Sequence, residues 1–72
     1  MEKVFKLNEI DCAVCAAKAE KRVSKGKGVT HATVDFMTQR LFVEAQEMNG
    51  ALIEEIKAAV RKIEPDCEVT EV

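Results

Sequence analysis

The central stretch of the sequence reads VTHATVDFMTQRLFVEA, residues 29–45, and its pattern decides the fold. Apolar and polar residues alternate over residues 29–36 and again over residues 41–45, which is typical of strands with one buried face. The mostly polar residues 37–40 between these segments can reverse the chain, so the stretch predicts a β-hairpin. We expect the inward face of the hairpin to consist of Ala32, Val34, Phe36, Leu41, Val43 and Ala45.

The segment before the hairpin predicts a helix over residues 15–24. It is rich in Ala, Lys, Glu and Arg, which are good helix formers. Gly26 and Gly28 end it. Its apolar stripe, with steps of three and four residues, consists of Ala16, Ala19 and Val23. Because these side chains are small, the helix should lie close to the surface that it covers.

The segment after the hairpin predicts a second helix. Asn49 can cap its first turn, because an Asn side chain accepts a hydrogen bond from a free backbone N–H there. Pro65 ends it, since the residue before a proline avoids helical geometry. The stripe of this helix follows the helical period and consists of Leu52, Ile56, Val60 and Ile63.

Two further alternating segments, residues 3–9 and 67–72, predict strands at the two ends of the chain. In the first, Phe5 and Leu7 share one face. The order β-α-β-β-α-β predicts an α+β, ferredoxin-like βαββαβ fold, in which two helices cover one face of a four-stranded antiparallel sheet. We expect residues 1–72 to form a single domain of this kind.

Right-handed crossovers place three connections at the same end of the predicted sheet. They are residues 9–15, residues 37–40 and residues 64–66. A pair of cysteines lies in the first of them, so this end of the sheet is where we expect the chemistry.

The composition excludes several classes of function. The net charge is −2 with both signs mixed along the chain, and there is no Trp or Tyr for base stacking, which argues against nucleic-acid binding. No apolar run approaches the roughly 20 residues that span a bilayer. The chain has a single His and a single Ser, which argues against a nucleophile–base pair and an enzyme. From Met1 the sequence runs into a charged, alternating stretch, so we expect no signal peptide. We also expect a monomer, located in the cytoplasm or at the cytoplasmic face of a membrane.

Cys12 and Cys15 form a C-x-x-C pair where the first helix begins. The free N–H groups and the positive end of the helix favour anions, so the pKa of both thiols should be lowered. Thiolates are soft ligands that select Cu(I), Zn(II) and Cd(II). A structural zinc site takes four ligands, usually as two pairs, and the sequence has no second pair. The pair therefore predicts an open surface site whose ion is handed on by ligand exchange.

Residues 10–20, IDCAVCAAKAE, resemble the signature of heavy-metal-associated (HMA) domains, and residues 28–38, GVTHATVDFMT, resemble the second strand and turn of that family. The resemblance covers essentially the whole chain and implies that Cys12 and Cys15 are the metal ligands. The family includes cytosolic metallochaperones and the N-terminal modules of P-type ATPases that export soft metals. The implied partner is therefore another metal-binding domain or the transmembrane part of such an exporter.

The flanking residues favour a divalent ion. Copper-handling members usually carry Met and often Thr where this chain has Ile10 and Asp11, and the Asp-Cys-x-x-Cys form resembles the modules of zinc, cadmium and lead exporters. A carboxylate is a hard third ligand that suits a divalent ion and offers little to Cu(I). The alternative role of Asp11 is to cap the helix. Glu9 replaces a common glycine, and residues 64–66 lack the lysine that often balances a Cu(I)–dithiolate charge.

We therefore expect one Zn(II), Cd(II) or Pb(II) ion, with Cu(I) as the alternative, in the N-terminal domain of an exporting P-type ATPase. The end of the sequence at the last predicted strand also favours a module of a larger protein. A free-standing metallochaperone is the alternative. A thiol–disulfide oxidoreductase is disfavoured, because the chain has one proline and no Trp or Tyr beside the thiols. A protein-interaction module with incidental thiols is the third possibility.

Five other residues have both a functional and a structural interpretation. Cys67 is either a core residue or an auxiliary thiol. His31 should face solvent on the open side of the sheet, about 15 Å from the cysteine pair. Met37 is expected to be an exposed turn residue, and Phe42 to lie on the uncovered face. Lys18 either favours the thiolates electrostatically or belongs to a solvated helix face.

Overall fold

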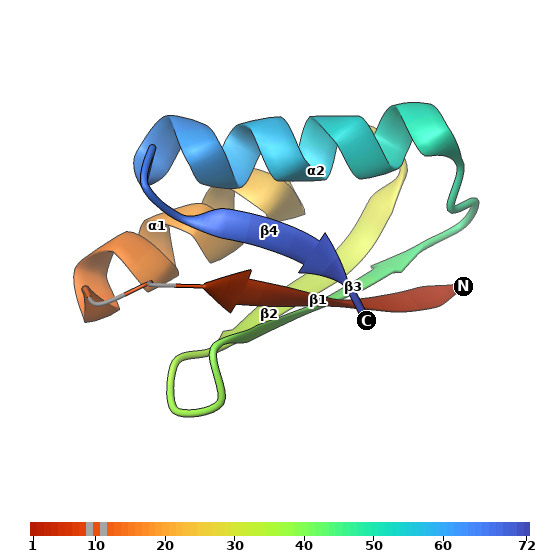
Figure 1. Ribbon diagram of the computed structural model, residues 1–72. Helices are drawn as coiled ribbons and strands as arrows, with labels where there is room; N and C mark the ends of the chain where they lie inside the picture. Colours follow the sequence, from red (N-terminus) through yellow and green to blue (C-terminus); the bar gives the residue numbers. More distant parts are fainter. Residues whose placement is uncertain (9, 11) are drawn as a thin grey trace.

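The element order of the computed structural model is β-α-β-β-α-β, as the sequence predicts (Figure 1). The structure describes residues 1–8, 10 and 12–72. Its elements are β1 (Glu2–Asn8), α1 (Ala13–Ser24), β2 (Val29–Asp35), β3 (Arg40–Ala45), α2 (Gly50–Ile63) and β4 (Glu68–Glu71). The predicted extension of the first strand to Glu9 lies outside the described residues.

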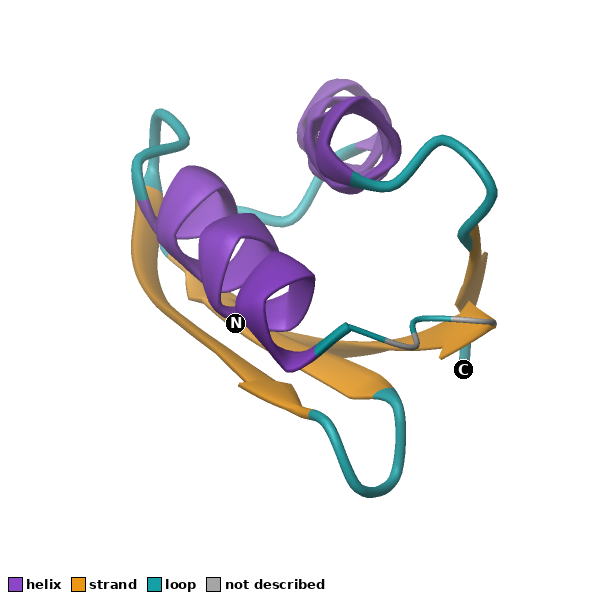
Figure 2. Ribbon diagram, turned by 90° about the vertical axis from the view of Figure 1, so that its left-hand side faces the viewer, coloured by secondary structure: helices purple, strands orange, loops and turns teal. Residues whose placement is uncertain are grey.

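The sheet has the strand order β2-β3-β1-β4, and each neighbouring pair is antiparallel. Phe5 of β1 pairs with Leu41 of β3, and Leu7 pairs with Val69 of β4, so the inward residues of three strands lie side by side. Both helices cover the same face of this sheet (Figure 2). The predicted ferredoxin-like fold is therefore confirmed.

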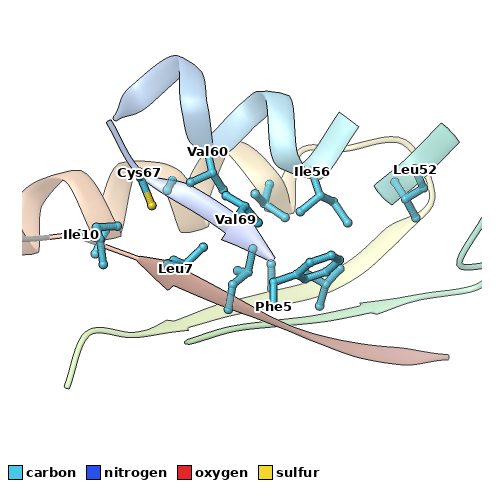
Figure 3. Packing of buried hydrophobic residues seen from close by; sticks show 14 of the residues in the cluster. Phe5, Leu7, Ile10, Leu52, Ile56, Val60, Cys67 and Val69 are labelled. Atoms are coloured by element: carbon cyan, nitrogen blue, oxygen red, sulfur yellow. The ribbon is translucent and has the colours of Figure 1, made fainter. Parts of the chain in front are cut away.

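The core lies between the helices and the sheet and is built from the predicted stripes (Figure 3). Burying a large aliphatic or aromatic side chain contributes about 1.5–3 kcal/mol. The small stripe of α1 lets that helix lie close to the sheet, whereas α2 contributes larger side chains. The buried residues are Phe5, Leu7, Ile10, Ala16, Ala19, Val23, Ala32, Leu41, Val43, Ala45, Leu52, Ile56, Val60, Cys67 and Val69.

Phe36 is the clearest exception to the predicted pattern. The prediction that it faces inward is wrong, since β2 ends at Asp35 and the Phe36 side chain is 38% exposed. The carboxylate of Asp35 accepts hydrogen bonds from the backbone N–H groups of Met37 (3.0 Å) and Thr38 (3.3 Å). This side-chain turn takes Phe36 out of the strand one residue early.

The ends of α2 agree with the sequence prediction. Asn49 caps the helix, with its side-chain oxygen accepting from the backbone N–H of Leu52 at 2.9 Å. The helix ends at Ile63, two residues before Pro65, and Ile63 itself is half-buried. Among the described residues no helix is long and apolar enough to cross a membrane.

Three connections meet at one end of the sheet, which is at the left of Figure 1. The backbone N–H of Leu7, near the end of β1, donates to the carbonyl of Gln39 in the β2–β3 turn at 2.8 Å. The carboxylate of Glu64, in the α2–β4 connection, hydrogen-bonds with the thiol of Cys15 at the start of α1. The turn therefore lies beside the end of β1, and the α2–β4 connection lies beside Cys15.

Candidate metal site

Cys12 and Cys15 lie on the first turn of α1. Cys12 is the N-cap, with an extended backbone (φ −115°, ψ 117°), and its carbonyl accepts the helical hydrogen bond from Ala16 at 2.9 Å. Its sulfur accepts a hydrogen bond from the backbone N–H of Cys15 at 3.3 Å. A thiol thus occupies the capping position that Ser, Thr, Asp or Asn usually fills. The C-x-x-C spacing brings both sulfurs to the same side of the helix tip, because residues three positions apart share a helix face.

The immediate neighbours of the pair differ in how deeply they are buried. Ile10 is fully buried in the core, whereas Val14, between the two cysteines, is 62% exposed. Cys12 and Cys15 are half-buried thiols that form no disulfide. The pair is therefore anchored from below by the core and remains reachable from solvent.

The pair is electrostatically asymmetric. The pKa of Cys12 is lowered, chiefly because the Cys15 side chain hydrogen-bonds to it and also because the backbone N–H groups of Cys15 and Val14 do so. The pKa of Cys15 is raised to about 11, first by that same hydrogen bond with Cys12, then by desolvation and by Glu64. The prediction that the helix end lowers the pKa of both thiols is wrong for Cys15. Two adjacent thiols share a proton more readily than they hold two negative charges, so Cys15 keeps the proton.

Glu64 is the residue at this site that the sequence analysis missed. Its carboxylate raises the pKa of Cys15 by hydrogen bonding with the thiol and by its negative charge. Glu64 is the C-cap of α2 and has a non-helical backbone (φ −134°, ψ 89°), as expected for the residue before a proline. Its position in residues 64–66, one of the three connections at this end, was the signal that could have identified it.

Asp11, the predicted third ligand, lies outside the described residues. Its alternative role as the helix cap lies outside them as well, and the capping group that the structure describes is the sulfur of Cys12. Over residues 1–8, 10 and 12–72, no three Cys, His, Asp or Glu side chains are grouped as a ready metal-ligand cluster. The donors that the structure describes at the helix tip are therefore the two sulfurs, with the Glu64 carboxylate beside Cys15.

The other singled-out residues are either exposed or part of the core. Cys67 is 2% exposed and belongs to the core cluster, as predicted. His31 is exposed, and its ring nitrogen hydrogen-bonds with the Thr33 hydroxyl at 2.9 Å. Met37 is 89% exposed in its turn, and Lys18 is exposed on α1.

Comparison with known proteins connects this geometry to a family. The model of the heavy-metal-associated domain matches residues 4–66. A curated relative, the cadmium, zinc and cobalt-transporting ATPase of Helicobacter felis, is 37% identical over 62 residues, which cover 86% of this chain. The chain spans only 8% of the length of that ATPase.

Two solved structures share the fold over nearly the whole chain. The N-terminal domain of ZntA in the apo form is 28% identical with a TM-score of 0.77, and the match covers 99% of this chain and 90% of that one. The Cu(I)-loaded N-terminal domain of a potential copper-translocating P-type ATPase from Bacillus subtilis is 29% identical with a TM-score of 0.77, covering 97% of this chain and 84% of that one. The family match includes both cysteines and four of the six elements in full, and the chain therefore belongs to the heavy-metal-associated domain family, whose members are metal-binding modules and not catalysts.

Proposed function

We propose that this domain binds one soft divalent ion, Zn(II), Cd(II) or Pb(II), through Cys12 and Cys15 and passes it to a partner by ligand exchange. The observation that carries this proposal is the placement of two half-buried sulfurs on one turn at the tip of α1, with the pKa of Cys12 lowered. Thiolates are the donors that soft ions prefer. The carboxylate of Glu64 adds an oxygen donor and a negative charge beside Cys15.

Ligand exchange follows from the openness of such a site. Two protein sulfurs leave coordination positions for an incoming ligand, whereas a structural zinc site is closed by four. A thiolate of the partner can bind the ion before Cys12 or Cys15 releases it. The ion is then never free in water, and no large barrier for a bare cation has to be crossed.

Charge favours a divalent ion over Cu(I). At a given distance, a carboxylate attracts a doubly charged ion twice as strongly as a singly charged one. Glu64 lies beside Cys15, and Asp11 directly precedes Cys12 in the sequence. The α2–β4 connection, residues 64–66, has two carboxylates and no lysine. These charges support zinc, cadmium or lead as the cargo.

The cellular context that we propose is the cytoplasmic N-terminal domain of a P-type ATPase that exports these ions. Residues 1–72 would then act as one monomeric module, and the partner would be another metal-binding domain or the transmembrane part of the exporter. The Helicobacter felis relative, a cadmium, zinc and cobalt-transporting ATPase, supports this context. A free-standing metallochaperone for Cu(I) is the second candidate, supported by the similarity to the Cu(I)-loaded domain from Bacillus subtilis.

The test is a competition titration of the reduced domain with Zn(II), Cd(II), Pb(II) and Cu(I) against chelators of known affinity. The proposal predicts one ion per chain, lost with Cys12→Ala and with Cys15→Ala. Cys67→Ala is the matched control, because it removes a thiol from the core and should leave the stoichiometry unchanged. Tight binding that survives loss of either surface cysteine, or turnover of a disulfide substrate without tight metal binding, would overturn the proposal.

A further inference from the structure

Gln39 has an unusual backbone conformation. It lies at the end of the β2–β3 turn with φ 56°, and it is the one residue other than glycine with a positive φ in the described part of the chain. Glycine or Asn usually occupies this left-handed region, because a longer L side chain is strained there. Such strain persists where the surrounding contacts hold it in place, so the contacts of Gln39 need an explanation.

Those contacts lead to the chain segment before the cysteine pair. The backbone carbonyl of Gln39 accepts a hydrogen bond from the N–H of Leu7 at 2.8 Å. Its side-chain amide nitrogen donates to the carbonyl of Ile10 at 3.1 Å. One turn residue therefore holds both the end of β1 and the backbone two residues before Cys12.

Ile10 is held from its other side by the core. Its side chain is fully buried, and Figure 3 shows it at the same end of the core as Cys67. The side chain alone allows the peptide plane to rotate, and the hydrogen bond from Gln39 fixes the direction of the carbonyl. Ile10, two residues before Cys12, is thus restrained both by packing and by a hydrogen bond.

We propose that Gln39 is a positioning residue for the metal site: it holds the backbone of Ile10, two residues before Cys12, in place before an ion arrives. This inference rests on the proposed function. A segment ordered on folding does not have to lose its conformational freedom on binding, so the ion is held more tightly. The role needs a donor at this length of side chain: Glu offers no donor to a carbonyl, Asn is one methylene shorter, and Gly relieves the backbone but has no side chain.

The test compares Gln39→Gly and Gln39→Glu with the control Met37→Ala, which changes an exposed side chain of the same turn. We expect Gln39→Gly to bind Zn(II) and Cd(II) about 10-fold more weakly, the lower end of the effect of losing an outer-shell hydrogen bond. Its thermal stability should be equal to or above that of the wild type, because glycine suits the positive φ. Gln39→Glu should also bind more weakly, and Met37→Ala should bind as the wild type does.

A second readout needs no metal. In the ion-free protein, the backbone amides of residues 12–15 should exchange with solvent several-fold faster in Gln39→Gly than in the wild type or Met37→Ala. A purely structural role would instead lower thermal stability and leave the affinity of the folded domain unchanged. Unchanged affinity with unchanged exchange in both Gln39 variants overturns the positioning role alone. A wild-type domain that binds no ion through its cysteine pair overturns the proposed function, and the positioning role with it.

Discussion

The backbone N–H of Cys15 donates to the sulfur of Cys12 at 3.3 Å, so each thiol of the pair has a different environment. Cys12 caps the helix and is stabilised as a thiolate, whereas Cys15 keeps its proton between Cys12 and Glu64. Cys12 is therefore the more acidic thiol of the pair before a metal arrives. This asymmetry has chemical consequences that can be measured without knowing the physiological ion.

Alkylation of the ion-free, reduced protein should be selective. The thiolate is the nucleophile, so iodoacetamide should modify Cys12 before Cys15 at neutral pH. Because the pKa of Cys15 is about 11, its modification should become fast only in alkaline solution. Mass spectrometry of peptides after timed quenching measures both rates, and Cys67, which is 2% exposed, is the internal control. Equal rates for Cys12 and Cys15 at neutral pH would refute the asymmetry.

Metal binding should release protons. At neutral pH Cys15 is protonated, since its pKa is about 11, and it must lose that proton to coordinate an ion. The affinity should therefore rise with pH through the neutral range, by about tenfold per pH unit for each proton displaced. Calorimetry in buffers of different ionisation enthalpy measures the proton count. A binding enthalpy independent of the buffer would contradict the prediction.

Glu64→Gln should change the selectivity between ions. Losing the carboxylate lowers the pKa of Cys15, which affects Zn(II), Cd(II) and Cu(I) alike if all use both sulfurs. The substitution also removes one negative charge, whose attraction for a divalent ion is twice its attraction for Cu(I) at the same distance. The ratio of Zn(II) to Cu(I) affinity should fall about fivefold, equivalent to about 1 kcal/mol for one unit charge near a solvated surface.

The matched control for this variant is Asp66→Asn, which removes a carboxylate from an exposed position in the same connection. It should change the Zn(II) to Cu(I) ratio less than Glu64→Gln does. Competition titrations of both variants with both ions provide the ratios. If Glu64→Gln has the same ratio of Zn(II) to Cu(I) affinity as the wild type, Glu64 does not contribute to the selectivity between these ions.

Stability should fall in acid because of Glu71 on β4. Its carboxylate lies 2.9 Å from the ammonium of Lys3 on β1 and 3.7 Å from that of Lys57 on α2. The hydrogen bond from Lys3 is the main reason that the pKa of Glu71 is lowered. A carboxyl with a lowered folded-state pKa stabilises the fold above its unfolded pKa of about 4.3, and this contribution disappears as the pH falls through the lower, folded-state value.

Denaturant unfolding across the acid range tests this linkage, with Glu71→Gln as the variant. The variant should be less stable than the wild type at neutral pH, and the two curves should converge in acid. Added salt should narrow the neutral-pH difference, because the carboxylate side chain is 41% exposed and the pairs are screened. A stability difference between the wild type and Glu71→Gln that is the same at every pH would show that these ion pairs do not cause the loss of stability in acid.

Much of the fold follows from local patterns that the tertiary structure reinforces. The hairpin, both helical stripes and the Asn49 cap are predictable, because burial selects the same residues that the strand and helix periods select. Phe36 departs from its period because one side chain, Asp35, terminates the strand through hydrogen bonds to the backbone. The alternation of apolar and polar residues does not show where such a hydrogen-bonded turn ends the strand.

The position of the cysteine pair was predictable from the sequence, and its electrostatics were not. Cys12 and Cys15 can be recognised from their spacing at a helix start. The raised pKa of Cys15 depends first on Cys12 and also on Glu64, about fifty positions further along the chain. The carbonyl of Ile10 is bound by Gln39 from the β2–β3 turn. Both are tertiary contacts between connections that meet at one end of the sheet. The topology places them in the right region, but only the folded chain specifies which atoms touch.

X-ray absorption at the zinc edge of the domain loaded with one equivalent of Zn(II) tests the central claim most directly. The account predicts two sulfur ligands at about 2.3 Å, completed by oxygen or nitrogen donors. Cys12→Ala and Cys15→Ala should each remove sulfur from the shell, and Cys67→Ala should leave it unchanged. A first shell without sulfur, or one that stays the same in both surface-cysteine variants, would contradict the account.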